Sequence, residues 1–215
     1  MKNRDKAILV DGLKYIKYSY VASLITTLLP IVILPLIIVG IFSSMLMATL
    51  IGFISIFFGV MKLTQLIFLY NGFKSLNTIE TEGLKSKTKK AYTFTATYVF
   101  ILIGGWLLTK FMDSILIVQI HDYLTSLFLL IISYLTLQVL EDENVLGPKD
   151  KWLNYYVLAL MLLETANFLG IQFIGSGITY QFNNLTYEAA SILSIVTSIF
   201  ILLKVNTYFK QVNEM

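Results

Sequence analysis

The sequence predicts an all-α membrane protein: a polytopic bundle of six transmembrane helices with both chain ends in the cytoplasm. Of its 215 residues, 57% are hydrophobic and only 13% are charged, and the mean hydropathy is +0.77. This composition leaves too little polar surface for a soluble globular protein. Stretches such as VASLITTLLPIVILPLIIVG are apolar on every side, which favours helices over the alternating strands of a membrane barrel.

Six apolar stretches are long enough to cross a hydrocarbon core of roughly 30 Å as helices. They cover approximately residues 18–40, 44–70, 91–109, 123–140, 152–175 and 188–208. Because the apolar region from 18 to 70 is too long for one span, GIFSS at residues 40–44 is predicted to be a turn. No other linker or loop is large enough to form a domain, so residues 1–215 are predicted to be a single transmembrane domain.

The first 17 residues are predicted to be a cytoplasmic interfacial segment that leads into the first span. In AILVDGLKYIK, residues 7–17, lysines alternate with apolar side chains. An interfacial helix would turn its lysines to water and its apolar side chains to lipid. The side chains expected to face lipid are Ile8, Leu9, Leu13 and Ile16.

The distribution of lysine and arginine predicts the orientation, because cytoplasmic loops retain an excess of both. With six spans, the basic residues of segments 1–17, 71–90, 141–151 and 204–215 all fall on one side. Lys110 alone falls on the other. We therefore expect a multi-pass protein of the cell membrane with both termini cytoplasmic.

The sequence lacks the residues that several kinds of metal and haem site require. The chain has no cysteine and a single histidine, His121, so thiolate metal sites, paired haem imidazoles and zincin-type histidine pairs are excluded. His121, Asp122 and the nearby Asp113 are predicted at the outer surface, where a solvated turn is favoured over a metal site. We expect no catalytic residue, metal ligand or cofactor.

The net charge of +3 and the run KSKTKK at residues 85–90 do not predict a nucleic-acid partner. A short basic loop between spans is what cytoplasmic retention and attraction to anionic lipid headgroups require. No domain large enough to fold around RNA or DNA is present. The expected partners are membrane lipids, together with other integral membrane subunits or a second copy of the chain.

Small residues line one face of the second span at intervals of four, three and four. This small-residue stripe consists of Ala48, Gly52, Ser55 and Gly59. Pairs of small residues four apart allow helix backbones to approach closely in lipid. The stripe is therefore predicted to pack against another helix.

Polar residues continue that face and predict an intramembrane polar cluster. Lys62 and Gln65 follow the stripe, while Glu164 and Asn167 share one face of the fifth span near the middle of the bilayer. A charged side chain at such a depth costs on the order of 3 kcal/mol and normally has a partner. We therefore predict a contact between Lys62 and Glu164, with Gln65 and Asn167 as polar neighbours.

Two short glycine-containing segments resemble those of small polytopic archaeal membrane proteins of uncharacterised function. The segments are Gly12-Leu13-Lys14, at the entry to the first span, and Gly72-Phe73-Lys74-Ser75-Leu76, at the end of the second. The resemblance covers about the first third of the chain. It implies a multi-helix membrane fold and no activity or site residue.

Two functions remain open for the polar cluster. As a joint, it would lock the packing of a non-enzymatic accessory or scaffold subunit, which is the interpretation that the sequence favours. As a working part, Glu164 would exchange a proton or ion in a small coupled transporter, with Pro30 and Pro35 opening the first span. An intramembrane enzyme comes third, because no nucleophile–base pair or carboxylate dyad is evident.

Overall fold

The computed structural model describes residues 3–38, 44–79, 82–112, 114–174, 192 and 195–212, and this part of the chain contains helices and no strand. The helices are α1 (Asn3–Ile38), α2 (Ser44–Leu76), α3 (Glu82–Phe111), α4 (Ile115–Asp142), the short 3-10 helix η1 (Pro148–Asp150) and α5 (Trp152–Ile174). Residues 195–212 form a further helix, here named the C-terminal helix. The all-α prediction is confirmed, and each long helix overlaps one predicted stretch. The predicted turn at 40–44 falls almost wholly outside the described residues.

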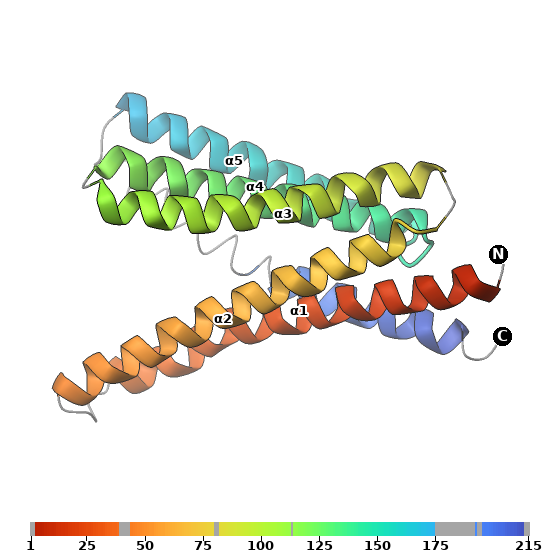
Figure 1. Cartoon of the computed structure of the whole chain (residues 1–215), viewed down its shortest axis with the longest axis horizontal. Helices are drawn as coiled ribbons and strands as arrows, with labels where there is room; N and C mark the ends of the chain where they lie inside the picture. The colour runs from red at the N-terminus through yellow and green to blue at the C-terminus, as the bar shows by residue number, and fades with distance from the viewer. Residues whose placement is uncertain are drawn as a thin grey trace.

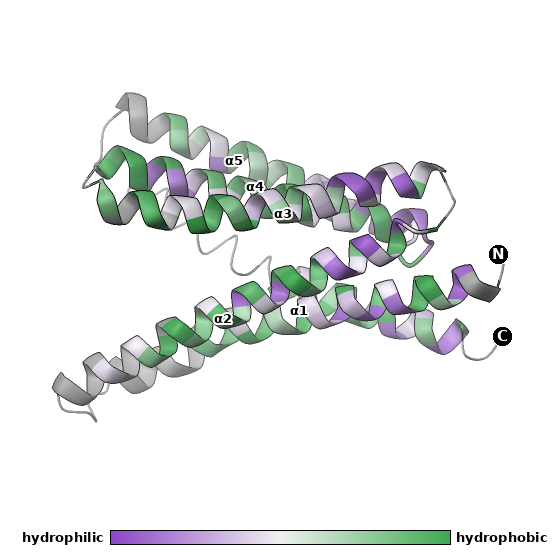
Figure 2. Cartoon of the chain, viewed as in Figure 1, coloured by the Kyte–Doolittle hydropathy of each residue, from purple (hydrophilic) through white to green (hydrophobic). Residues whose placement is uncertain are grey.

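Helices that are consecutive in the chain pack against each other, in the pairs α1–α2, α2–α3, α3–α4 and α4–α5. In Figure 1, α1, α2 and the C-terminal helix form one group, and α3, α4 and α5 form the other. The start of α1, the end of the C-terminal helix and the connection from α4 to α5 lie at the same end of the bundle (Figure 1). Figure 2 shows that hydrophilic residues gather at this end, whereas hydrophobic residues dominate the rest of the helices.

The hydrophobic core runs through this polar end as well as through the middle of the bundle. Leu9, Leu13 and Ile16 of α1 are fully buried in it. The prediction that they face lipid is wrong, because α1 continues unbroken from Asn3 and packs its first turns against the end of α2. Its 36 residues span about 54 Å at 1.5 Å per residue, which is longer than a bilayer core.

Two glycines bring the backbones of α1 and α2 into contact. A Cβ atom added to Gly72 would lie 3.0 Å from the carbonyl oxygen of Gly12 and 3.0 Å from Cγ1 of Ile16. A Cβ atom added to Gly12 would lie 2.6 Å from Cδ2 of Leu76. Only residues without a side chain fit at this crossing.

The small-residue stripe of α2 does not pack against a helix of this chain where its residues can be placed. Gly52 and Gly59 are exposed, and a Cβ atom on either would meet nothing within 4 Å. The side chains of Ala48 and Ser55 lie outside the description. Packing of the stripe against another helix therefore stays a prediction, and within the described residues the close contact of α1 with α2 lies at Gly12 and Gly72 instead.

Two helices among the described residues are long and apolar enough to cross a membrane, Gly52–Leu76 and Ile115–Asp142. Core helices of soluble proteins can pass the same test, but they are mostly buried. Here only 18% and 6% of the most apolar stretch is buried inside the protein. The large apolar side chains exposed on α2 to α4 include Phe53, Ile56, Phe100, Phe111 and Ile115.

The end of α4 shows how the sequence turns the chain toward α5. Asn144 has a φ of 56°, the left-handed conformation that asparagine tolerates better than most residues. The Val145 N–H then donates to the carbonyl of Leu140 at 2.9 Å, which closes the helix. Pro148 begins η1, where the Asp150 carboxylate accepts a 2.8 Å hydrogen bond from the Gly147 N–H.

Candidate functional site

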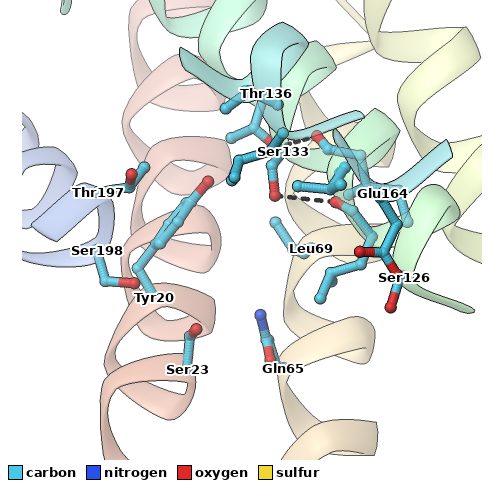
Figure 3. A pocket seen from close by; sticks show the side chains of 15 residues that line it. Tyr20, Ser23, Gln65, Leu69, Ser126, Ser133, Thr136, Glu164, Thr197 and Ser198 are labelled. Atoms are coloured by element: carbon cyan, nitrogen blue, oxygen red, sulfur yellow. Dashed lines mark hydrogen bonds between the residues drawn. The ribbon is translucent and has the colours of Figure 1, made fainter. Parts of the chain in front are cut away.

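The candidate site is a cavity of about 150 Å³ between α1, α2, α4, α5 and the C-terminal helix (Figure 3). Nine of its fifteen lining residues are polar: Tyr20, Ser23, Gln65, Ser126, Ser133, Thr136, Glu164, Thr197 and Ser198. In Figure 3, Glu164 and Ser126 lie on one side of the space, and Thr197 and Ser198 lie on the opposite side. Helices far apart in the sequence thus contribute polar groups to one site.

Helical spacing explains the polar wall that α4 supplies. Ser126 and Ser133 are seven residues apart and Thr136 follows three residues later, so all three lie on one face. The Ser133 hydroxyl donates to the Leu129 carbonyl at 2.9 Å, and the Thr136 hydroxyl donates to the Ile132 carbonyl at 2.7 Å. Because these hydroxyl protons are committed to the backbone, the oxygen lone pairs remain as acceptors.

Two further hydroxyls complete the wall opposite Glu164. Tyr20 lines the cavity together with Thr136, whose own proton already goes to the backbone. The Thr197 hydroxyl is buried and has no hydrogen-bond partner among the described residues. A buried polar group without a partner is costly unless a water or ligand satisfies it.

Glu164 is the charged group of the cavity. It is half-buried on α5, and Ser126 of α4 lies beside it on the same side of the cavity (Figure 3). Gln65, which is 8% exposed, lines the same cavity from α2. The structure therefore brings together Gln65 and Glu164, two of the four residues of the predicted polar cluster.

The structure does not bring Lys62 to Glu164. No ion pair joins them in the part of the chain that is described, and Lys62 is not among the residues lining the cavity. The reason is that α5 packs on α4, where Glu164 lies beside Ser126. The side chain of Asn167 lies outside the described residues.

An ion pair ties the C-terminal helix to η1 and so holds Thr197 and Ser198 at the cavity. Lys204 Nζ lies 2.8 Å from Asp150 Oδ2, and Trp152 packs edge-to-face on Phe200 with ring centroids 6.0 Å apart. Burial acts to raise the pKa of Asp150, but hydrogen bonds from Lys204 and Gly147 and the Lys204 charge outweigh it, so this pKa lies below its ordinary value.

This lowered pKa predicts that acid destabilises the protein. The Asp150 carboxylate contributes stability above its unfolded pKa of about 4, and the contribution is lost as pH falls through the lower folded value. Lys204 is partly exposed, so solvent screening limits the effect to about 1 kcal/mol, or roughly 2 to 4 °C in unfolding temperature. Thermal unfolding in detergent between pH 6 and pH 3 should therefore fall more steeply for wild type than for Asp150→Asn. Parallel curves would contradict this assignment.

His121 lies within α4 and faces α3. A Cβ atom added to Gly105 would lie 1.8 Å from its ring carbon Cδ2, so the imidazole occupies the space that glycine leaves. Its Nε2 atom is buried without a hydrogen-bond partner among the described residues. His121 thus packs between helices, and the described residues hold no group of metal-ligating side chains around it.

Sequence reasoning found Gln65 and Glu164 because an amide and an acid are rare in apolar helices. It missed the hydroxyl residues, since serine and threonine are common in such helices and satisfy themselves on the backbone of the preceding turn. The spacing of Ser126, Ser133 and Thr136 was the available signal. Even so, only the packed helices reveal that this face meets Tyr20 and Glu164.

No family model matches the chain, and neither a curated protein nor a solved structure matches it. The cavity and its lining side chains are therefore the basis for assigning a function.

Proposed function

We propose that the protein is a multi-pass membrane protein with six spans and both termini in the cytoplasm. The exposed apolar surfaces of α2 and α4 support insertion into lipid. The lysine-rich segments and the hydrophilic end of the bundle (Figure 2) support a common cytoplasmic side for both chain ends. In such a bundle the cavity lies among spans, with Glu164 inside the bilayer.

Within the membrane, the protein acts as a small proton- or ion-coupled carrier centred on Glu164. The observation that carries this proposal is a polar cavity whose carboxylate has no cationic partner among the described side chains. A charge inside a bilayer costs on the order of 3 kcal/mol, and such groups mark ion and substrate pathways. A structural joint would instead need a partner that neutralises Glu164, and Lys62 does not serve as one.

A scaffold role is the second candidate, and the small-residue stripe supports it. Gly52 and Gly59 are exposed beside the exposed Phe53, Ile56 and Val60. Exposed glycines on an apolar helix allow the backbone of another membrane helix to approach closely. The scaffold would use this outer face of α2, whereas the carrier uses the interior, so the two functions are separable by experiment.

Cysteine accessibility tests the carrier directly, because the chain contains no cysteine. Ser133→Cys places a thiol in the cavity wall. With vesicles of either orientation, the membrane-impermeant cation trimethylammonium-ethyl methanethiosulfonate should modify it from both faces. A carrier exposes its site to each side in turn, whereas a scaffold interior stays closed to the reagent.

Ser19→Cys is the matched control. Ser19 lies on α1, is buried, donates to the Ile16 carbonyl at 2.8 Å and is not a lining residue of the cavity. Cysteine at position 133 should react at least about tenfold faster than cysteine at position 19, since reactivity follows exposure. Equal, slow modification of both from either face would overturn the carrier and leave the scaffold.

A further inference from the structure

We infer that the ligand of the cavity is a small organic cation with a primary ammonium group. This inference rests on the proposed function, since it names the class of solute that the carrier takes. Three properties of the cavity point to it: the sign of its charge, the direction of its hydrogen bonds, and its volume combined with its apolar wall.

Among the described residues, no cation forms an ion pair with the acidic group of the site. Glu164 contributes a carboxylate, and the five ion pairs among the described residues do not involve it. Nor does the sequence contain any lysine, arginine or histidine between Trp152 and Leu203, which covers α5 and the cavity-lining part of the C-terminal helix. A ligand that enters this space is therefore selected for positive charge, since an anion would face Glu164 without any compensating cation.

The hydroxyl groups of the cavity wall favour a ligand that donates hydrogen bonds. Ser133 and Thr136 give their protons to backbone carbonyls. These two residues of α4 therefore present oxygen lone pairs to the cavity. A primary ammonium carries three N–H donors and no acceptor, which matches this wall better than a quaternary ammonium without N–H groups.

The volume and the apolar lining select the size. A cavity of about 150 Å³ admits a molecule of roughly six non-hydrogen atoms, as a benzene-sized cavity does. A bare metal ion would leave most of this space empty. Leu69, Val157 and Leu160 line the remainder of the cavity, which suits a short alkyl chain attached to the ammonium.

Protection of the cavity thiol tests the inference. Purified Ser133→Cys protein in lipid nanodiscs is treated with the methanethiosulfonate reagent at neutral pH. The probes are n-butylammonium, its isomer tetramethylammonium, and n-butanol. The two cations have the same atoms and charge but differ in N–H groups, whereas the alcohol keeps the chain and removes the charge. Butylammonium should slow modification and raise the unfolding temperature, and the other two should do neither.

Glu164→Gln in the same background should weaken protection by butylammonium about tenfold to a hundredfold, the worth of a charge-assisted hydrogen bond. Glu143→Gln is the matched control, because Glu143 lies beyond the end of α4 and does not line the cavity. Unchanged butylammonium protection in Glu164→Gln would overturn the inference. So would stronger protection by tetramethylammonium or n-butanol than by butylammonium.

Different experimental results would contradict the proposed ligand class and the proposed carrier function. If the cavity thiol reacts from both membrane faces but no ammonium compound protects it, the class of solute is wrong and the carrier stands. If the thiol reacts from neither face, the carrier itself is wrong. Retention of a single size-exclusion peak and of helical circular dichroism shows that each variant remains folded.

Discussion

Gly72→Leu should destabilise the protein by about 3 kcal/mol, the upper range of what overpacking costs. Even a Cβ atom at this position would lie 3.0 Å from the Gly12 carbonyl oxygen and 3.3 Å from the Ile16 backbone nitrogen. These are backbone atoms, which cannot rotate away as a side chain does. The crossing of α1 and α2 would have to open, exposing Leu13 and Phe73 of the core. Thermal unfolding in detergent measures the change.

Gly59→Leu is the matched control on the same helix. Gly59 is exposed and has nothing within 4 Å of an added Cβ atom, and leucine forms helices better than glycine by roughly 1 kcal/mol. The unfolding temperature of this variant should stay the same or rise slightly. If both variants unfold alike, the close crossing at Gly72 is not what holds α1 to α2. The same Gly59 variant tests the scaffold, because it would block close approach of a second helix.

Gly105→Ala should cost about 2 kcal/mol through His121. The new Cβ atom would lie 1.8 Å from Cδ2 and 2.8 Å from Cγ of the imidazole, so the whole ring must move. No small rotation relieves a clash that reaches the ring atom nearest the backbone. Since α3 packs on α4 along this face, the displaced ring either separates the helices or leaves a void between them.

Removing the imidazole should remove this cost. In a His121→Ala background, Gly105→Ala should change the unfolding temperature little, which gives a coupling energy of about 2 kcal/mol in the double-mutant cycle. His121→Ala alone reports the loss of the packed ring. Additive effects of the two substitutions would show that the glycine and the histidine do not share this space.

Helix content was predictable because the long apolar stretches lack the alternation of polar and apolar residues that membrane strands need. The predicted stretches 44–70, 123–140 and 152–175 lie within or nearly match α2, α4 and α5. The helix ends differ more at α1 and α3, which extend into lysine-bearing segments. The predicted spans at 18–40 and 91–109 began just after Lys17 and Lys90, yet lysine is a good helix former and the helical backbone includes both residues.

The site was predicted in part, for reasons that particular residues make clear. Glu164 and Gln65 were identifiable because a carboxylate and an amide stand out in a sequence of mostly apolar residues. The pairing of Glu164 with Lys62 was not found, since depth along two helices says nothing about which helices are neighbours. Leu9, Leu13 and Ile16 were assigned to lipid for a related reason: an apolar stripe looks the same whether it faces a bilayer or another helix.

The sequence by itself determined that this chain folds as long apolar helices with its basic residues gathered toward one end. Those properties depend on composition and on the distance between residues along one helix, which the sequence states directly. Only the tertiary structure decided that α1 and α2 cross at Gly12 and Gly72, that His121 fills the space at Gly105, and that Glu164 and Ser126 lie together on one side of a polar cavity. Each of these depends on which faces of separate helices pack against each other. Van der Waals contact between the side chains of different helices decides that packing, and the sequence does not state it.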